Sequence, residues 1–324
     1  MKKLIKYSFF SIGGILAIII MALTYISYAL PNVGAPPDIE VKITAEKVER
    51  GRYLALHVMQ CIECHAERDF NYFAGPMIEG TEAAGGERFD QSMGFPGVFI
   101  SPNITPYGIG DWTDGELFRL ITTGVKNNGD PIFPVMPYHN YGKLDEDDIR
   151  AVIAYLRTIE PIETNHPVSK ADFPFNFILR TIPEKAQLSQ RPPENNKLAY
   201  GQYMFTAAAC GDCHTQFEKG SFTGPLAGGG REFGLPDGSI LRAPNLTPHE
   251  TGLKHWTKED FVNRFKRYDS PDYRPHRVNE GDFQTIMPWI TYAGMKTSDI
   301  EAIYIFLQSL EPYDNSVEMF TARK

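Results

Sequence analysis

The feature that most constrains the fold of this 324-residue chain is a pentapeptide that occurs twice. "CIECH" begins at Cys61 and "CGDCH" begins at Cys210, and together they contain all four cysteines. The flanking sequences also correspond: "SPNITP" resembles "APNLTP", "VMPY" resembles "IMPW", and "DIRAVIAYLRTIEP" resembles "DIEAIYIFLQSLEP". The order is the same in both copies, so the sequence indicates an internal duplication and predicts two similar domains.

The duplication sets the expected domain boundaries. Residues 44–162 and 196–324 are expected to form the two domains. Residues 163–195 contain prolines and polar residues with weak periodicity, which predicts a linker. Residues 31–43 are expected to tether the first domain to an N-terminal segment, residues 1–30.

Each domain is predicted to be mostly helical, without a convincing series of strands. A first helix is expected from about Thr44 into Cys61, and its counterpart from about Leu198 into Cys210. Glycine permits two helices to cross closely. Gly51 and Gly201 are therefore expected where the first helix of each domain crosses the last.

The other expected helices carry N-terminal capping signals. A middle helix follows each of two Trp-Thr pairs, and a last helix begins near Asp145 in one domain and near Ser298 in the other. Apolar residues three and four apart give each last helix one apolar face. The expected capping boxes are Thr113 with Glu116, Thr257 with Asp260, and Ser298 with Glu301.

The N-terminal 30 residues are predicted to cross a membrane. Three lysines precede an uncharged run from Tyr7 to Leu30. As a helix these residues span about 36 Å, enough for a hydrocarbon core of about 30 Å. The lysines favour a cytoplasmic N-terminus, which predicts a single-pass protein on the periplasmic face of the bacterial inner membrane. A cleaved signal peptide ending at Ser27-Tyr28-Ala29 is the alternative, and it exports the same residues.

The exported part of the chain is acidic. The first 30 residues hold three lysines and no acid, so removing them lowers the formal charge from −8 to −11. This balance argues against a nucleic-acid partner. It is compatible with a basic patch on a protein partner.

Cys-x-x-Cys-His is the attachment signature of c-type haem. The two thiols bond to one edge of the porphyrin, and the following histidine ligates the iron. The sequence thus predicts two covalently attached haems. The first is expected on Cys61, Cys64 and His65, and the second on Cys210, Cys213 and His214.

Three alternative roles for the cysteines fit the sequence less well. A disulfide framework leaves both histidines unexplained. Four thiolates on one zinc would need a much shorter spacing between the two pairs. A thioredoxin-like redox pair needs a βαβ context, which is absent from the sequence.

The sixth iron ligands are predicted to be Met136 and Met287. Each lies about 70 residues after its histidine and is followed by proline and an aromatic residue, in matching positions of the two copies. His139 and His276 are alternatives without a counterpart in the other copy. Most other methionines are expected to fill the core.

Two further pairs are candidates for supporting the haems. A carbonyl near Pro76 or Pro225 is expected either to accept a hydrogen bond from the proximal histidine or to form a plain turn. Asn103 and Asn245 are expected either near a haem propionate or in a turn.

Both domains resemble class I cytochrome c. They share a helix that leads into Cys-x-x-Cys-His, a proline soon after, a Met-Pro loop and a final helix of the "AYLRTI" type. The first domain is similar to cytochrome subunits of membrane-bound alcohol, gluconate and sugar dehydrogenases through the stretch from "SPNITP" to "AYLRTI". That resemblance implies electron transfer from a dehydrogenase toward quinone or an oxidase. The chain departs from the family pattern because it has two haem motifs where those subunits usually have three.

Two functions follow as hypotheses. The first is a membrane-anchored dihaem cytochrome without catalysis of its own, which passes electrons between a dehydrogenase or respiratory complex and a terminal acceptor. Its partners would be a dehydrogenase subunit, an oxidase or a soluble cytochrome. The alternative is a dihaem enzyme such as a peroxidase, with an open second iron and Arg274, His276 or Glu280 assisting proton transfer.

Overall fold

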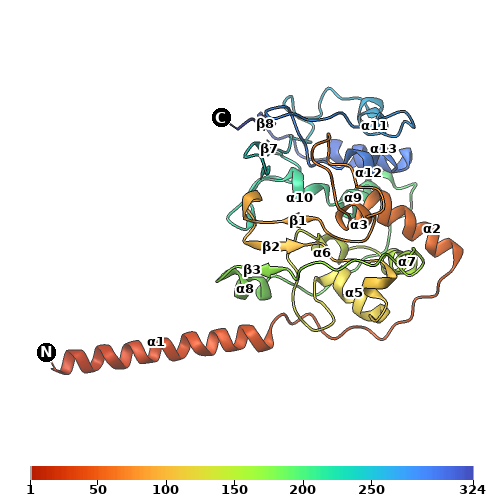
Figure 1. Cartoon of the computed structure of the whole chain (residues 1–324). Coiled ribbons are helices and arrows are strands. Elements are labelled where there is room, and N and C mark those ends of the chain that lie inside the picture. Colours follow the sequence, from red (N-terminus) through yellow and green to blue (C-terminus); the bar gives the residue numbers. More distant parts are fainter. Residues whose placement is uncertain (1, 324) are drawn as a thin grey trace.

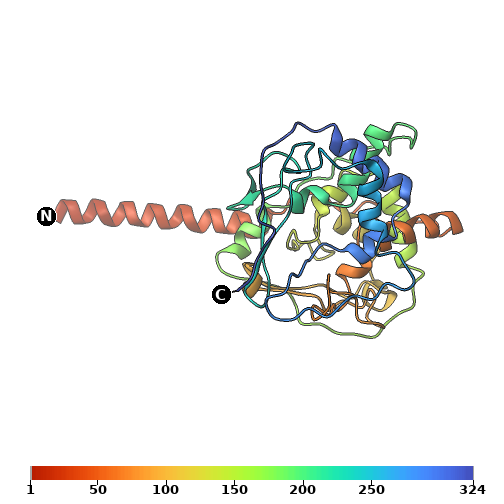
Figure 2. The ribbon, with the colours of Figure 1, turned by 90° about the horizontal axis from the view of Figure 1, so that it is seen from above.

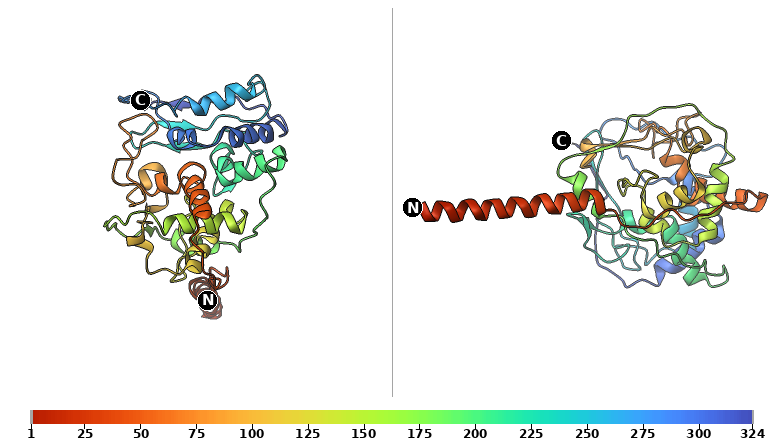
Figure 3. Two further views of the ribbon diagram at one scale, coloured as in Figure 1. Left: turned by 90° about the vertical axis from the view of Figure 1, so that its right-hand side faces the viewer. Right: turned by 90° about the horizontal axis from the view of Figure 1, so that it is seen from below.

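The computed structural model describes residues 2–323, which form a mostly helical body with one long helix projecting from it (Figure 1). That helix, α1 (Lys2–Ala29), contains one stretch long and apolar enough to cross a membrane, Ile5–Ala29. The right view of Figure 3 shows it leaving the body as an isolated rod. The expected mostly helical class and the apolar N-terminal helix are therefore confirmed.

Residues 44–162, here called the first half, and residues 196–324, the second half, contain corresponding helices. In each half a first helix leads to the pentapeptide, a middle helix follows, and a short helix precedes the last one. The first half contains α2 (Ala45–Tyr53), the π-helix η1 (Leu54–Val58), α3 (Cys61–Cys64), η2 (Gln91–Met93), α4 (Pro106–Ile109), α5 (Asp114–Thr123), α6 (Tyr138–Tyr141) and α7 (Glu146–Leu156). The second half contains α9 (Lys197–Ala207), α10 (Cys210–His214), α11 (Lys258–Lys266), α12 (Trp289–Ala293) and α13 (Thr297–Gln308).

The first and last helices of each half cross at a glycine. A Cβ on Gly51 would lie 1.8 Å from the carbonyl oxygen of Ala151 in α7, and a Cβ on Gly201 would lie 1.9 Å from that of Ala302 in α13. Only glycine allows backbones to approach so closely. The predicted crossings of α2 with α7 and of α9 with α13 are confirmed.

Two of the three predicted capping boxes are confirmed. Thr113 with Glu116 caps α5, and Thr257 with Asp260 caps α11. The third prediction is wrong, because α13 begins after Lys296 without a side-chain cap. There the hydroxyl of Tyr53, from the other half, accepts the Lys296 N–H at 3.1 Å. An inter-half contact has replaced the local cap.

The structure also contains small antiparallel sheets, which the sequence did not predict. Each half contains a hairpin with which a strand that follows the last helix pairs, and the second half contains a further two-stranded hairpin just after its pentapeptide. The sheets are β1 (Arg88–Phe89), β2 (Gly97–Ile100) and β3 (Lys170–Ala171); β4 (Phe217–Glu218) and β5 (Ser221–Phe222); and β6 (Glu232–Gly234), β7 (Ile240–Arg242) and β8 (Phe320–Thr321).

The segments expected as tether and linker lie against the first half. The N–H of Val41 donates to Asp114 at 2.7 Å, and Gln187 N–H donates to the carbonyl of Gly142 at 2.7 Å. Residues 163–195 also contain β3, the short helix α8 (Phe175–Ile178) and the 3₁₀ turn η3 (Leu179–Thr181). The chain between the two halves is therefore packed on the surface of the first.

The two halves share one hydrophobic cluster, built largely from α2, α7, α9 and α13. Paired hydrogen bonds run across it in both directions. Tyr53 donates to Asp299 at 2.6 Å, and Tyr203 donates to Asp148 at 2.7 Å. Each tyrosine also accepts a backbone N–H at the start of the other half's last helix. The halves are thus joined by their cores as well as by the chain.

Candidate functional site

Each pentapeptide forms one helical turn that begins at a left-handed residue. Gln60 has φ 55° before Cys61, and Ala209 has φ 50° before Cys210. The expected continuous helix into the first cysteine is therefore wrong in both halves. The left-handed residue separates the incoming helix from the turn that carries the thiols. Positive φ is uncommon for residues other than glycine and marks a backbone held by its surroundings.

The two histidines are oriented by backbone carbonyls. His65 Nδ1 lies 2.7 Å from the carbonyl oxygen of Pro102, and His214 Nδ1 lies 3.0 Å from that of Pro244. A carbonyl only accepts, so each Nδ1 carries the proton and each Nε2 keeps its lone pair. The predicted carbonyls near Pro76 and Pro225 are wrong. The Pro76 carbonyl accepts the Asp69 N–H at 2.9 Å, and the Pro225 carbonyl accepts the Gly228 N–H at 3.0 Å in a turn. The acceptors of the histidines come from "SPNITP" and "APNLTP".

Burial acts on the same imidazoles. It lowers the pKa of His65 and of His214, although the hydrogen bond to the proline carbonyl opposes the shift in each case. The neutral ring, which is the form that ligates a metal, is therefore favoured. Among residues 2–323 neither Nε2 atom has a hydrogen-bond partner.

The asparagine that follows each proline fixes the carbonyl in place. Asn103 Oδ1 accepts the N–H and the hydroxyl of Thr105, and its Nδ2 donates to the carbonyl of Ile162 at 2.7 Å. Asn245 makes the same bonds to Thr247 and to the carbonyl of Tyr313. Of the two alternatives for these asparagines, the structure shows the turn.

A glycine in each half lies directly under the proline loop. Gly85 has φ 83° and a Cβ there would lie 2.6 Å from Ser101 O; Gly229 has φ 75° and a Cβ would lie 2.5 Å from Asn245 N. Their N–H groups donate to the carbonyls of His65 and His214 at 2.8 and 2.7 Å. This pair was not among the predicted residues, although "AAGGE" and "AGGGR" in matching positions signal it.

The predicted axial methionines occupy equivalent loops. Met136 and Met287 are both half-buried against the shared hydrophobic cluster, as are Cys61 and Cys210. The carbonyl of each methionine accepts an N–H two residues later at 2.8 Å, and the following proline starts α6 or α12. Both methionine side chains therefore pack against the same hydrophobic cluster as the first cysteine of each pentapeptide.

The donor sets fit c-type haem better than a shared zinc ion or a disulfide framework. All four cysteines are free thiols. Within the described part of the chain no three His, Cys, Asp or Glu side chains converge, so four thiolates do not share a zinc ion. Each half instead offers two thiols one helical turn apart and a neutral imidazole with a free Nε2, which is the donor set that haem c requires.

The two alternative axial histidines are engaged elsewhere. His139 Nε2 lies 3.0 Å from Asp212 Oδ2, and the ring of His276 stacks on Phe73 with centroids 5.0 Å apart. Both contacts join the halves. Asp212 is part of the second pentapeptide and also accepts from Asn140 at 2.9 Å, so the loop after Met136 is bonded to α10.

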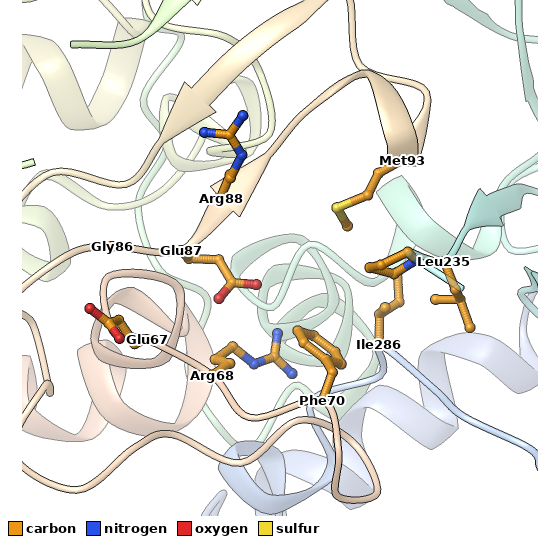
Figure 4. Close-up of a pocket in the computed structure, with 10 residues that line it drawn as sticks. Glu67, Arg68, Phe70, Gly86, Glu87, Arg88, Met93, Leu235 and Ile286 are labelled. Atoms are coloured by element: carbon orange, nitrogen blue, oxygen red, sulfur yellow. The ribbon is translucent and has the colours of Figure 1, made fainter. Parts of the chain in front are cut away.

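A pocket of about 260 Å³ lies beside the first pentapeptide, where the halves meet (Figure 4). Glu87 and Arg68 point into it from the first half, and Ile286 and Leu235 close it from the second. Burial raises the pKa of Glu87 to about 7. Ligand pockets usually measure about 300 to 1,000 Å³, so this one is too small for a porphyrin.

Comparison with known proteins finds cytochrome c subunits among the relatives of this chain. The chain is 28% identical to the gluconate 2-dehydrogenase cytochrome c subunit of Pantoea cypripedii over 85% of its own length and 62% of that protein. It is 28% identical to the fructose dehydrogenase cytochrome subunit of Gluconobacter japonicus, covering 75% of this chain and 50% of the relative.

A third relative is more similar in length. The diheme cytochrome c-type protein of Cereibacter sphaeroides is 27% identical over 74% of this chain and 79% of that protein. This chain is homologous to cytochrome c subunits. It spans half to about three-fifths of the length of the two dehydrogenase subunits. No family model matches it. The resemblance to dehydrogenase cytochromes drawn from the sequence is confirmed.

Proposed function

We propose that this chain is a membrane-anchored dihaem cytochrome c that passes electrons between a dehydrogenase or respiratory complex and a terminal acceptor. One observation carries the proposal: in both halves a histidine next to two thiols has its Nδ1 bonded to a fixed proline carbonyl and its Nε2 free. The similarity to a diheme cytochrome and to dehydrogenase cytochrome subunits supports it.

In this proposal each half holds one haem, which supplies an iron that gains and loses a single electron. Cys61 and Cys64 bind the first haem covalently and Cys210 and Cys213 the second. His65 and His214 are the proximal ligands, and Met136 and Met287 are the distal ones. The proline carbonyls orient the imidazoles and raise their basicity, as outer hydrogen bonds do for metal ligands.

The dihaem enzyme is the weaker alternative because it needs the segment before Met287 to move. That segment is attached to the first half instead. Gln284 donates to the carbonyls of Phe70 and Tyr72 at 2.9 and 3.0 Å and accepts the Ala74 N–H at 3.0 Å. A backbone bridge also joins Tyr72 to Arg277. Three side-chain bonds and a bridge hold the loop, which favours a closed iron and an electron carrier.

Anchoring by α1 would place both haems at the periplasmic face of the inner membrane, with the N-terminus in the cytoplasm. The apolar length of Ile5–Ala29 and the lysines before it support this topology. The partners proposed are a dehydrogenase subunit on one side and an oxidase or soluble cytochrome on the other. Confinement to the membrane surface would keep the carrier near both.

The proposal is tested by counting haems on the purified full-length chain and on two variants. The wild type is expected to carry two haems per chain by pyridine haemochrome assay and intact mass. Cys61→Ala with Cys64→Ala and Cys210→Ala with Cys213→Ala are each expected to keep one. A wild type with a single haem, or a variant that keeps both, would refute the assignment.

A further inference from the structure

Residues 168–180 form an exposed apolar patch on the side of the body from which α1 leaves. Val168 is 88% exposed, Phe173 is 81% exposed and Ile178 is 50% exposed. We name these three side chains the α8 patch. Single exposed apolar residues are normal on a protein surface, but three within eleven residues of one segment need an explanation.

The α8 patch lies at the base of the membrane-spanning candidate. Both α8 and η3 contact α1, and Arg180 Nε in η3 donates to the carbonyl of Leu30 at 2.9 Å, directly after α1 ends. Figures 1 and 2 show α8 beside the end of α1 from two directions. Wherever α1 enters a bilayer, α8 is at that surface.

The segment is held rigidly, so its exposed side chains have a fixed direction. Lys170 in β3 pairs with Val98 in β2, and the ring of Phe175 packs on Phe133 with centroids 5.7 Å apart. Arg180 forms an ion pair with Asp130 at 3.0 Å. Phe175 therefore faces the body while Phe173 and Ile178 face outward.

The charge of the segment differs from that of the body. Residues 168–185 contain the basic residues Lys170, Arg180 and Lys185 and the acidic residues Asp172 and Glu184, a balance of +1. The whole of residues 31–324 carries −11. A bilayer with anionic headgroups attracts a locally basic, apolar segment and repels the rest of the surface.

We propose that the α8 patch inserts into the headgroup region of the bilayer that α1 crosses, as a second attachment that fixes the orientation of the body. The proposal rests on α1 being the membrane anchor. One helix joined to a body leaves the body free to turn about the joint. A second contact to the same bilayer removes that freedom and determines which faces a redox partner meets.

The test uses the full-length, haem-loaded chain in vesicles of equal parts phosphatidylcholine and phosphatidylglycerol. The photocrosslinker p-benzoylphenylalanine replaces Phe173, Ile178, Ile43 or Ile18, one at a time. Ile43 is the matched control: it is 56% exposed and precedes α2, which lies on the far side of the body from α1 (Figure 1). Ile18 lies within α1 and reports the anchor itself. Irradiated protein that floats with the vesicles is digested with trypsin, and lipid adducts are measured by mass spectrometry.

Lipid adducts on the 171–180 peptide are expected from positions 173 and 178 at a yield at least about five times that from position 43. Adducts at position 18 without adducts at 173 and 178 would overturn the proposal and leave the anchor intact. Absence of adducts at position 18 would refute both the insertion of the α8 patch and the role of α1 as the membrane anchor. Crosslinks from 173 or 178 to another protein would overturn the proposal by showing that a subunit covers the patch.

Discussion

At the residue scale, Asn103 and Asn245 determine where the histidine acceptors lie. Each fills its side-chain hydrogen-bonding capacity with bonds to its own loop and to the segment after the last helix. The sequence "PN" therefore places a carbonyl at a fixed distance from Nδ1. If His65 and His214 ligate iron as proposed, each asparagine would act on that iron through the proline carbonyl, without contacting the histidine itself.

Replacing Asn103 by alanine tests this chain of contacts. Loss of its buried bonds is expected to lower the free energy of unfolding by about 2–3 kcal/mol and to shift the reduction potential of one haem only. Asn245→Ala is expected to shift the other. The exposed Asn128→Ala serves as control. If potentiometric titration finds both reduction potentials unchanged in Asn103→Ala and in Asn245→Ala, the proposed influence of the proline loops on the haems is contradicted.

Gly85 offers a second test with a close internal control. Gly85→Ala is expected to lower the free energy of unfolding by about 2–4 kcal/mol, because it combines a strained φ with a steric clash. Gly80 has nearly the same φ, 86°, but a Cβ there would have nothing within 4 Å. Gly80→Ala is therefore expected to cost only about 1 kcal/mol. If denaturant titrations give the same loss of unfolding free energy for Gly85→Ala and Gly80→Ala, the positive φ alone determines the cost and the steric clash does not contribute.

Glu87 gives a prediction for pH. It is 8% exposed, and burial raises its pKa from 4.5 to about 7. The native carboxyl therefore holds a proton in this window after the unfolded chain has released it, so raising the pH through the window lowers stability. Glu87→Gln is expected to be more stable than the wild type by about 1–2 kcal/mol at pH 8 and equal to it near pH 4. A difference that does not change with pH, measured by thermal unfolding, would contradict this role of burial.

At the scale of elements, the last helices α7 and α13 receive a tyrosine from the opposite half. Tyr53 and Tyr203 each bridge a helix N-terminus and a buried aspartate of the other half. Asp148 is 2% exposed and also pairs with Arg50 at 2.7 Å. Burial alone would raise the pKa of Asp148, but the hydrogen bonds from Arg50 and Tyr203 lower it. The charged form is stabilised where the halves meet.

Tyr203→Phe leaves Asp148 without one donor and is expected to lower the free energy of unfolding by about 1–3 kcal/mol. Tyr53→Phe is expected to cost the same through Asp299. The double variant is expected to unfold in two calorimetric transitions where the wild type shows one. Tyr155→Phe is the control, because within residues 2–323 its hydroxyl has no protein partner. A double variant with one transition would contradict the coupling of the halves.

Parts of the fold were predictable from the sequence for physical reasons. Gly51 and Gly201 recur at matching positions in periodic helices, and close helix crossings need a residue without a side chain, so both were placed correctly. Capping boxes at α5 and α11 involve residues three apart and could be found locally. The cap of α13 could not, because Tyr53 is 243 residues away from Lys296.

The same division applies to the candidate site. The thiols and histidines lie within five consecutive residues, so their chemistry could be stated from the sequence. The acceptor of each Nδ1 lies 37 residues away in one half and 30 in the other, beyond any local pattern. Gly85 and Gly229 were not predicted, because glycines in matching positions are typical of turns but do not identify the backbone that approaches them. Met136 and Met287 as axial ligands stay predictions.

At the scale of the whole molecule, the two halves pack against each other, and α1 projects from them. They share a hydrophobic core and are bonded through Asp212, Gln284 and the two tyrosines. These contacts would suit the proposed carrier, because electron exchange between two haems needs a constant separation. The segment before Met287 is bonded to the first half through Gln284, which would oppose the loop movement that the alternative dihaem enzyme needs.

The central claim is that both irons are closed by a methionine and that the chain carries electrons without catalysis. The most direct measurement is the optical spectrum of the purified full-length chain, oxidised and reduced, with and without carbon monoxide and peroxide. We expect two low-spin haems whose spectra do not change with either ligand, and a carbon monoxide complex only in Met136→Ala or Met287→Ala. A wild-type haem that binds carbon monoxide or turns over peroxide would contradict the claim.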